Sequence, residues 1–227
     1  MTDVQTDPPA TPTPPQGRRH ARPSSFKSNF WKELPILIGA AVVVALLVRT
    51  FVLQTFYVPS ESMEHTLNIN DRVLVNKLVY DFRSPRRGEV IVFTSPLDWR
   101  TAENEKDFVK RVIGVPGDHV ACCTNGHITV NGAVIDEPYL DPDAGPNAPA
   151  SPNTFSIDVP PGRLWVMGDN RVESADSRYH YQQTSNIQEA TIPISSVIGR
   201  AFVLFWPPGR ATWLTVPKAF DAVPNAP

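Results

Sequence analysis

"DFVKRVIGVPGD", residues 107–118, is a run rich in β-branched and aromatic residues that ends at a Pro-Gly turn. This composition favours a strand, in which successive side chains point to opposite faces. Lys110 and Arg111 interrupt the apolar run, so alternation sends them to opposite faces and one of them must point inward. The alternative, from this stretch alone, is a Lys110 on a solvated face with Arg111 paired elsewhere.

Similar short runs recur on both sides of this stretch, separated by turn residues. No long segment beyond them repeats apolar residues at a helical period, and Asn131-Gly132 is a hairpin signal. We therefore expect residues 54–216 to form an all-β domain, barrel-like and built of mostly antiparallel sheets, with a Pro-rich insertion around 138–161. The runs are "RVLVNKLV" (72–79), "GEVIVFT" (88–94), "HITVNGAVI" (127–135), "TFSIDV" (154–159), "RLWVMG" (163–168) and "VIGRAFVLF" (197–205).

The N-terminal part has a different composition. Residues 34–53, "LPILIGAAVVVALLVRTFVL", carry one charge, Arg49, and have the length of a membrane-spanning helix. A cleaved signal peptide is the alternative, but no A-x-A site follows. The positive-inside rule then predicts a single-pass protein of the cell membrane, with a cytoplasmic N-terminus and an extracytoplasmic β-domain. The basic residues that precede the span are Arg18, Arg19, Arg22, Lys27 and Lys32.

The two ends of the chain contain few large apolar groups. Residues 1–33 are Pro-rich and basic, and they cannot bury enough apolar surface to offset chain entropy. We expect a disordered cytoplasmic tail over 1–33 and a flexible C-terminal tail over 217–227.

Composition also limits the ligands. The net charge of -2 provides no broad basic field, and no zinc-type Cys and His spacing is present. We therefore expect neither nucleic acid nor metal to bind. Cys122 and Cys123 are adjacent, and a reduced pair and a vicinal disulfide are equal alternatives.

"VPSESMEHTL", residues 58–67, places Ser60 and Ser62 just beyond the predicted span, where an ordinary turn would also suit them. A serine becomes a nucleophile only when a base removes its proton. A lysine held among apolar neighbours has a lowered pKa, so Lys110 is the better candidate base. Spacing alone does not exclude a triad with a histidine. The histidines beyond the predicted span are His65, His119, His127 and His180.

"MGDNRVESADSRYH", residues 167–180, gathers six charged or hydroxyl side chains directly after a predicted strand. Such density is typical of a solvated loop, or of a polar network that orients a catalytic base. The six are Asp169, Arg171, Glu173, Ser174, Asp176 and Arg178.

The order of these stretches is specific even though each one is common. Ser60-Glu61-Ser62-Met63, then "RRGEVIVF" (86–93), then "FVKRVIGVPGD" (108–118), then "MGDNRVESADSR" (167–178) follow a predicted membrane span. In this order the chain closely resembles bacterial type I signal peptidases over most of residues 35–206.

The resemblance implies a role for each matching position. Ser62 matches the nucleophile and Lys110 its general base. Ser60 matches the hydroxyl that forms the oxyanion hole with the backbone N–H of Ser62. Ser174 matches the hydroxyl that hydrogen-bonds the lysine amine. Further matches are a supporting ion pair, Asp176 and Arg178, and the lining of shallow substrate pockets, Phe56, Val58, Met63 and Val109.

Two departures from the family pattern are visible. His65 stands where the family usually has proline, and Val172-Glu173 replaces the usual Asp-Asn or similar pair. None of these three positions matches a residue with a chemical role. They leave open the rigidity of the loop and the detail of the supporting network.

The resemblance implies a membrane-anchored serine endopeptidase that cleaves signal peptides after small residues through an acyl-enzyme, without cofactor. Its partners would be preproteins with signal peptides and the lipid bilayer, with transient contact with the export machinery. One alternative is a self-cleaving Ser/Lys protease of the repressor type, which should lack the span and carry a DNA-binding domain. Another is an anchored β-domain that binds extended peptides without cutting them.

"LFWPPGRATWL", residues 204–214, clusters Phe205, Trp206 and Trp213 among prolines. Core packing is the ordinary role of such rings. The alternative is that one or more of them lies in the lipid headgroup region.

Overall fold

The computed structural model describes residues 27–47, 49, 52–100, 102, 106–140 and 150–226. The chain divides into two units, Met1–Val43 and Val44–Pro227. Most of the predicted N-terminal tail, residues 1–26, lies outside the described residues, as do residues 141–149 of the predicted insertion.

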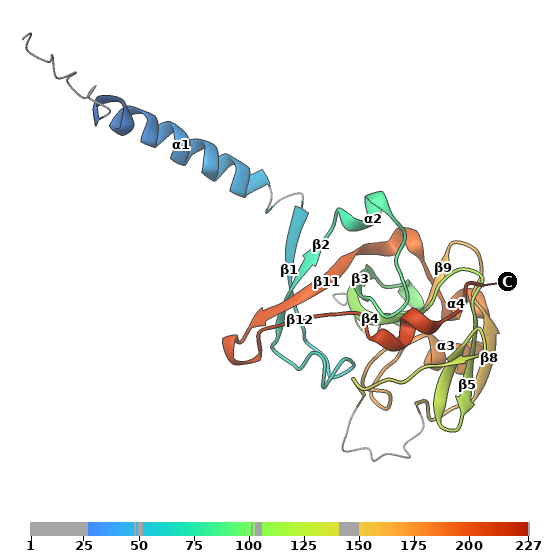
Figure 1. The fold of residues 1–227 in the computed structure, drawn as a ribbon. Helices are drawn as coiled ribbons and strands as arrows, with labels where there is room; N and C mark the ends of the chain where they lie inside the picture. Colours follow the sequence, from blue (N-terminus) through green and yellow to red (C-terminus); the bar gives the residue numbers. More distant parts are fainter. Residues whose placement is uncertain are drawn as a thin grey trace, which may run out of the picture. The chain divides into compact units, whose positions relative to one another are not determined.

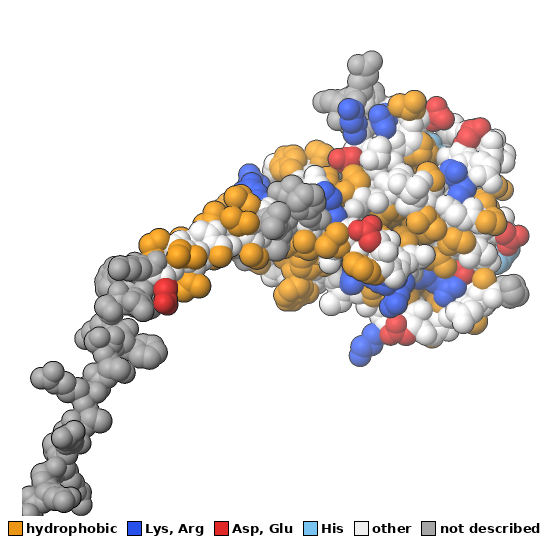
Figure 2. All heavy atoms as spheres, turned by 90° about the horizontal axis from the view of Figure 1, so that it is seen from above, with side chains coloured by type: hydrophobic (Ala, Val, Ile, Leu, Met, Phe, Trp, Pro, Cys, Tyr) orange, Lys and Arg blue, Asp and Glu red, His pale blue; other side chains and the backbone are white. Residues whose placement is uncertain are grey.

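Helix α1 spans Lys27–Leu47 and begins inside the segment for which we expected disorder. It overlaps the predicted span over residues 34–47, while residues 48, 50 and 51 are not described. Apolar side chains of α1 are exposed, as Figure 2 shows in orange. Among the described residues, no helix meets the length and apolarity required of a membrane span. The exposed side chains include Ile36, Leu37, Ile38, Val42, Val43, Val44 and Leu46.

The second unit is a mostly-β domain of antiparallel sheets, as predicted (Figure 1). Its larger sheet has eight strands in the order β1-β2-β11-β3-β4-β9-β10, with β12 paired to β11. Every strand pair of this sheet is antiparallel, and bulges interrupt the register of β11. The strands are β1 Leu53–Tyr57, β2 Arg72–Asn76, β3 Val90–Thr94, β4 Asp107–Gly114, β9 Arg163–Met167, β10 Ile192–Pro193, β11 Val197–Trp206 and β12 Thr212–Trp213.

A smaller four-stranded sheet has the order β7-β6-β5-β8. Its strands are β5 His119–Thr124, β6 His127–Val130, β7 Ala133–Val134 and β8 Phe155–Asp158. The predicted Asn131-Gly132 hairpin joins β6 to β7. Both residues have positive φ, 50° and 81°, which is the backbone that a two-residue primed turn requires.

Short helices connect the strands, and α3 lies beside α4 and β9 (Figure 1). Asp176 caps the N-terminus of α3, because its carboxylate accepts a hydrogen bond from the backbone N–H of Arg178. The helices are α2 Val79–Phe82, α3 Ser177–Thr184 and α4 Ile187–Ala190, with 3-10 turns at Leu97–Trp99, Ile194–Ser196, Pro208–Arg210 and Lys218–Ala222.

Three clusters of buried apolar side chains form the core. One lies between the smaller sheet and the C-terminal residues and includes Trp165, Ile128 and Phe220. A second includes Val58, Met63, Val73 and Leu204, and a third includes Phe93, Trp99 and Val166. The second cluster includes Met63, the residue next to Ser62.

The C-terminal residues differ from the flexible tail that we expected over 217–227. Residues Lys218–Ala222 form a 3-10 turn, and Phe220 and Val223 are buried. Pro224 accepts a hydrogen bond from Asn131 through its carbonyl. Apolar burial at two positions explains the order here, although the segment is short and polar on average. In the smaller sheet, Cys122 and Cys123 are paired as a vicinal disulfide.

Candidate active site

Ser62 and Lys110 meet in the interior of the domain, although 48 positions separate them in the sequence. Lys110 Nζ lies 2.5 Å from Ser62 Oγ in a buried hydrogen bond. Ser62 is 8% exposed and Lys110 4% exposed. Strand β4 directs Lys110 toward Ser62, while Ser62 begins the turn that follows the short extended segment after β1. The solvated alternative for Lys110 is therefore wrong.

Burial sets the proton affinity of Lys110. Loss of hydration lowers its pKa from 10.5 to about 8, against the opposing effects of the Asp176 and Asp169 carboxylates. The guanidinium of Arg178 acts in the same direction as burial. A lysine with such a pKa is neutral in a useful fraction of molecules near neutral pH, and a neutral amine can accept a proton.

Ser60 lies beside the same hydroxyl. Its Oγ is 3.3 Å from Ser62 Oγ, and its residue is exposed at the edge of the site. The backbone oxygen of Ser62 accepts a hydrogen bond from Asn170 N at 3.2 Å. This bond ties the serine turn to the loop that follows β9.

Ser174 is buried on the far side of Gly168, and its Oγ has no hydrogen-bond partner in the described structure. The hydrogen bond to Lys110 that the resemblance implies is therefore not formed in this structure. Gly168 fits tightly between the two serines, because a Cβ at this position would lie 2.2 Å from Ser174 Oγ and 2.3 Å from Ser62 O. Only glycine permits this approach.

Asp176 and Arg178 form the supporting pair that we expected. The Asp176 carboxylate accepts bonds from Arg178 Nε at 3.0 Å and Nη2 at 2.6 Å, and from Gly168 N at 2.9 Å. Burial opposes ionisation of Asp176, but the Arg178 cation and these hydrogen bonds outweigh it and keep the pKa below its usual value. Asp176 thus holds a negative charge near Lys110 and anchors Gly168.

Arg111 and Asp169 form a second buried pair whose role we did not predict from the sequence. Arg111 donates to Asp169 through Nε at 2.9 Å and Nη2 at 2.6 Å, and to Gly88 O at 2.8 Å. Thr66 donates to the same carboxylate at 2.6 Å. Because Thr66 follows Ser62 by four residues, Asp169 fixes the serine turn to β4. In the sequence, the only indication of a role for Asp169 was the high density of polar residues in 167–178.

The residues expected to line substrate pockets come together. Val58 and Met63 are buried, and Phe56 and Val109 pack against them in the second core cluster. They flank Ser62 and Lys110 in the sequence, so the apolar surface and the dyad share the same elements.

The histidines occupy other environments. His180 stacks on Trp99, with ring centroids 4.3 Å apart, and burial lowers its pKa. His119 pairs with Asp158 at 2.7 Å on the exposed face of the smaller sheet. The nitrogen that is bonded to Ser62 Oγ is that of Lys110.

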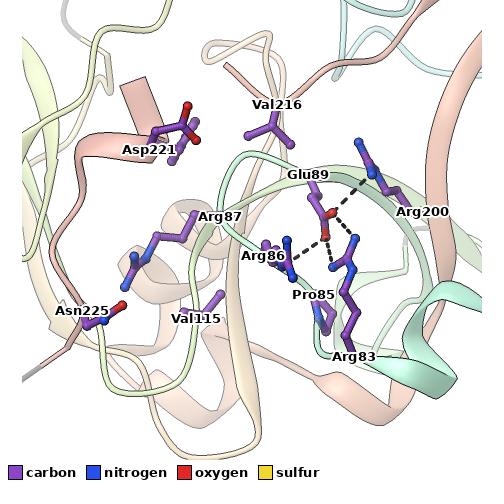
Figure 3. A pocket seen from close by; sticks show the side chains of 11 residues that line it. Arg83, Pro85, Arg86, Arg87, Glu89, Val115, Arg200, Val216, Asp221 and Asn225 are labelled. Carbon is purple, nitrogen blue, oxygen red and sulfur yellow. Dashed lines mark hydrogen bonds and ion pairs between the residues drawn. The ribbon is translucent and has the colours of Figure 1, made fainter. Parts of the chain in front are cut away.

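A cavity of about 440 Å³ lies elsewhere on the domain and shares no lining residue with the dyad. Figure 3 shows Arg83 and Arg200 pointing to the buried carboxylate of Glu89. Glu89 also accepts from the backbone N–H of Arg86 at 2.9 Å. The acidic residue of "RRGEVIVF" therefore fixes the start of β3, and neither Ser62 nor Lys110 lines this cavity.

The departures from the family pattern lie on the surface. His65 has φ of 73°, which proline cannot adopt because its ring fixes φ near −65°. Val172 is 80% exposed, and Glu173 is exposed with its N–H bonded to Asn170 Oδ1. The buried network includes Asp169, Asp176, Arg111 and Arg178.

Comparison with known proteins shows the family to which the chain belongs. Residues 31–206 match the family model of signal peptidase, peptidase S26. Signal peptidase I of Mycobacterium tuberculosis is 40% identical over 225 residues, which cover 83% of this chain and 76% of that protein. Probable signal peptidase I-2 of a Synechocystis strain is 40% identical over 200 residues, covering 88% and 84%. A signal peptidase I structure from Enterococcus faecalis overlaps 52% of this chain and 97% of its own, with 28% identity and a TM-score of 0.40.

The mostly-β domain brings a buried serine and a buried lysine into contact, and the related chains are peptidases. The chain belongs to the signal peptidase family, peptidase S26, and is an enzyme of the signal peptidase I type.

Proposed function

We propose that this protein is a membrane-anchored serine endopeptidase that removes signal peptides from exported preproteins through a Ser62/Lys110 dyad. The observation that carries the proposal is the buried 2.5 Å contact between Lys110 Nζ and Ser62 Oγ. The similarity to signal peptidase I and to probable signal peptidase I-2 supports signal peptides as the substrates.

In the first step, the neutral amine of Lys110 accepts the Ser62 proton while Oγ attacks the scissile carbonyl carbon. The charge that develops on the carbonyl oxygen is met by the Ser62 backbone N–H and the Ser60 hydroxyl. The tetrahedral intermediate collapses as the protonated Lys110 returns its proton to the leaving amine. The acyl-enzyme then holds the signal peptide as an ester of Ser62.

In the second step, Lys110 accepts a proton from water, and the hydroxide attacks the ester carbonyl. Collapse expels Ser62 Oγ, which recovers the proton from Lys110, and the signal peptide leaves with a free carboxylate. Asp176, Arg178, Asp169 and Arg111 hold the backbone that carries both groups, and the preprotein and one water molecule are the other reactants.

Substrate preference follows from the surface beside Ser62. Phe56, Val58, Met63 and Val109 form an apolar cluster in which Val58 and Met63 are buried, and we expect it to favour small residues at the −3 and −1 positions of the substrate. An extended substrate can add to a sheet edge, and β1 is one of the two outer strands in the path of the larger sheet.

The membrane anchor in the proposal is the segment 34–53, with residues 1–33 in the cytoplasm and the β-domain outside. The apolar side chains that α1 exposes support a lipid environment for this segment. A reporter fused after Pro227 should be active only outside the cytoplasm, and activity only inside would contradict this orientation.

Cleavage itself is tested with purified full-length protein in detergent and one preprotein. We expect a new N-terminus after a small residue for the wild type, and none for Ser62→Ala or Lys110→Ala with the fold retained. Binding of the preprotein without cleavage would favour the peptide-binding alternative. Cleavage only within the protein's own chain would favour the self-cleaving alternative.

A further inference from the structure

The segment 137–139, which begins the Pro-rich insertion, lies against two buried arginines of the active-site framework. The Glu137 carboxylate accepts from Arg171 Nη1 at 2.9 Å and also from Nη2. The Tyr139 hydroxyl donates to the same carboxylate at 2.5 Å. The Arg111 guanidinium lies 3.9 Å from the centroid of the Tyr139 ring. The segment thus contacts both arginines.

Arg171 connects this segment to the catalytic loop. Its Nε donates to Gly168 O at 3.1 Å, and its Nη1 donates to Ala150 O at 2.6 Å. Its own carbonyl accepts from Arg178 Nη2 at 3.1 Å. One guanidinium therefore links Glu137, just before the insertion, and Ala150, within it, to Gly168.

Gly168 transmits this link to the reacting groups. Its backbone is packed so closely on Ser62 O and Ser174 Oγ that a methyl group would not fit. Its N–H is bonded to Asp176, whose charge acts on Lys110. A small movement of Gly168 would change both the placement of Ser62 and the surroundings of the lysine.

Glu137 is the only carboxylate bonded to the Arg171 guanidinium among the described residues. Both side chains are nearly inaccessible to solvent, with 6% of Arg171 and 2% of Glu137 exposed. Burial alone would disfavour the Arg171 cation, and the Glu137 charge outweighs this and raises the Arg171 pKa. A buried arginine that loses its carboxylate partner is strongly destabilised. The Arg171 guanidinium would then move toward solvent and give up its hydrogen bond to Gly168 O.

We propose that Glu137 is a positioning residue for the dyad, which holds Arg171 and thereby sets Gly168 against Ser62. This inference rests on the proposed function, because it assigns Glu137 a part in cleavage by Ser62 and Lys110. The entrance to the Pro-rich insertion is then part of the catalytic framework rather than a separate surface loop.

Glu137→Gln tests the proposal, because it removes the charge while keeping the size and one acceptor oxygen. The matched control is Asp136→Asn, which removes a neighbouring exposed carboxylate. Full-length proteins are compared for preprotein cleavage, with kcat expressed per active serine after titration with a fluorophosphonate. We expect kcat per active site to fall about 10- to 100-fold in Glu137→Gln, with KM little changed, and to stay within about twofold in the control.

A double variant separates positioning from simple loss of stability. Glu137→Met with Arg171→Met removes both charges, and replacing a buried ion pair by apolar residues is often neutral for stability. We expect its Tm to return toward the wild-type value while kcat per active site stays low, because Gly168 O and Ala150 O have lost their donor. Wild-type kcat in the double variant would mean that the pair has only a structural role.

The outcomes distinguish a failure of the proposed function from a failure of the positioning role of Glu137. A wild-type protein that cleaves no preprotein overturns the proposed function itself. An active wild type together with an undiminished kcat per active site in Glu137→Gln overturns only the role of Glu137. Glu137→Gln could have a lower Tm and fewer titratable active sites than the wild type. The kcat per titrated site still shows whether Glu137 has a positioning role.

Discussion

Lys110 Nζ and Ser62 Oγ lie 2.5 Å apart with both side chains withdrawn from solvent. Burial lowers the lysine pKa to about 8, so the amine is neutral above that pH and protonated below it. We expect kcat/KM for preprotein cleavage to fall tenfold per pH unit below about pH 8, as a single-proton step. The measurement is a pH profile at saturating detergent and constant ionic strength.

Lys110→Arg should be inactive at every pH, because guanidinium does not lose its proton, and substantial cleavage by this variant would contradict the lysine base.

The burial of Lys110 also lowers the free energy of unfolding near neutral pH. The folded pKa of about 8 lies below the ordinary 10.5, so the unfolded chain binds more protons between these values and wild-type stability rises with pH there. At pH 7 the shift is equivalent to about 3 kcal/mol against the folded state. Lys110→Met should therefore raise the Tm by several degrees at pH 7, and less as the pH approaches 10, while cleavage is lost. Thermal unfolding of both proteins between pH 7 and 10 measures this difference, and a constant Tm difference would contradict the argument.

Ser60 is expected to contribute through charge stabilisation rather than through the proton transfer. Its hydroxyl lies 3.3 Å from Ser62 Oγ at the exposed edge of the site. Ser60→Ala should lower kcat about 100- to 1,000-fold, the usual effect of one lost oxyanion donor. The pH profile should keep its midpoint, since Lys110 is untouched. A shifted midpoint with unchanged maximal rate would assign Ser60 to the lysine environment instead.

The strands were predictable because their side chains follow a period of two over several residues. β3, β4, β8, β9 and β11 all lie within runs that alternate or are continuously apolar. β5 was missed because "HVACCT" contains small residues and two cysteines, which carry little strand signal. We did not predict helix α3 from the sequence, because its eight residues show too little periodicity. Asp176, directly before the first helical residue, was a capping signal for it.

The orientation of Lys110 could not be settled by alternation alone. Lys110 and Arg111 do point to opposite faces, but both faces of β4 are covered and both side chains are buried. Which one meets Ser62 depends on contacts between residues 48 positions apart, and the family resemblance supplied that pairing. Glu137 carried no local signal at all, because its role arises only when the smaller sheet brings it to Arg171.

Gly168 provides a sharp steric test of the site. An added Cβ would lie 2.2 Å from Ser174 Oγ and 2.3 Å from Ser62 O, well inside contact distance. Gly168→Ala should therefore displace the serine turn and abolish cleavage, with a stability loss typical of overpacking, about 1–3 kcal/mol. Gly132→Ala is a useful contrast, because no atom lies within 4 Å of its added Cβ. It should lower stability through its φ of 81° but leave kcat per active site unchanged. Comparable loss of kcat in both variants would point to general unfolding.

Trp206 and Trp213 are 50% and 70% exposed, so neither ring is packed in the core as tryptophan usually is. They lie on β11 and β12, and the Trp213 ring is 6.0 Å from that of Phe202. We expect these rings to lie in the headgroup region, since tryptophan prefers the membrane interface. Vesicles with brominated lipids should quench part of the wild-type tryptophan emission. Trp206→Phe and Trp213→Phe should each reduce this quenched part. Cleavage of a detergent-solubilised preprotein should be unchanged in both variants, because neither ring touches the dyad. If the emission lost on substitution is not quenched in the wild type, these two residues do not contact the membrane.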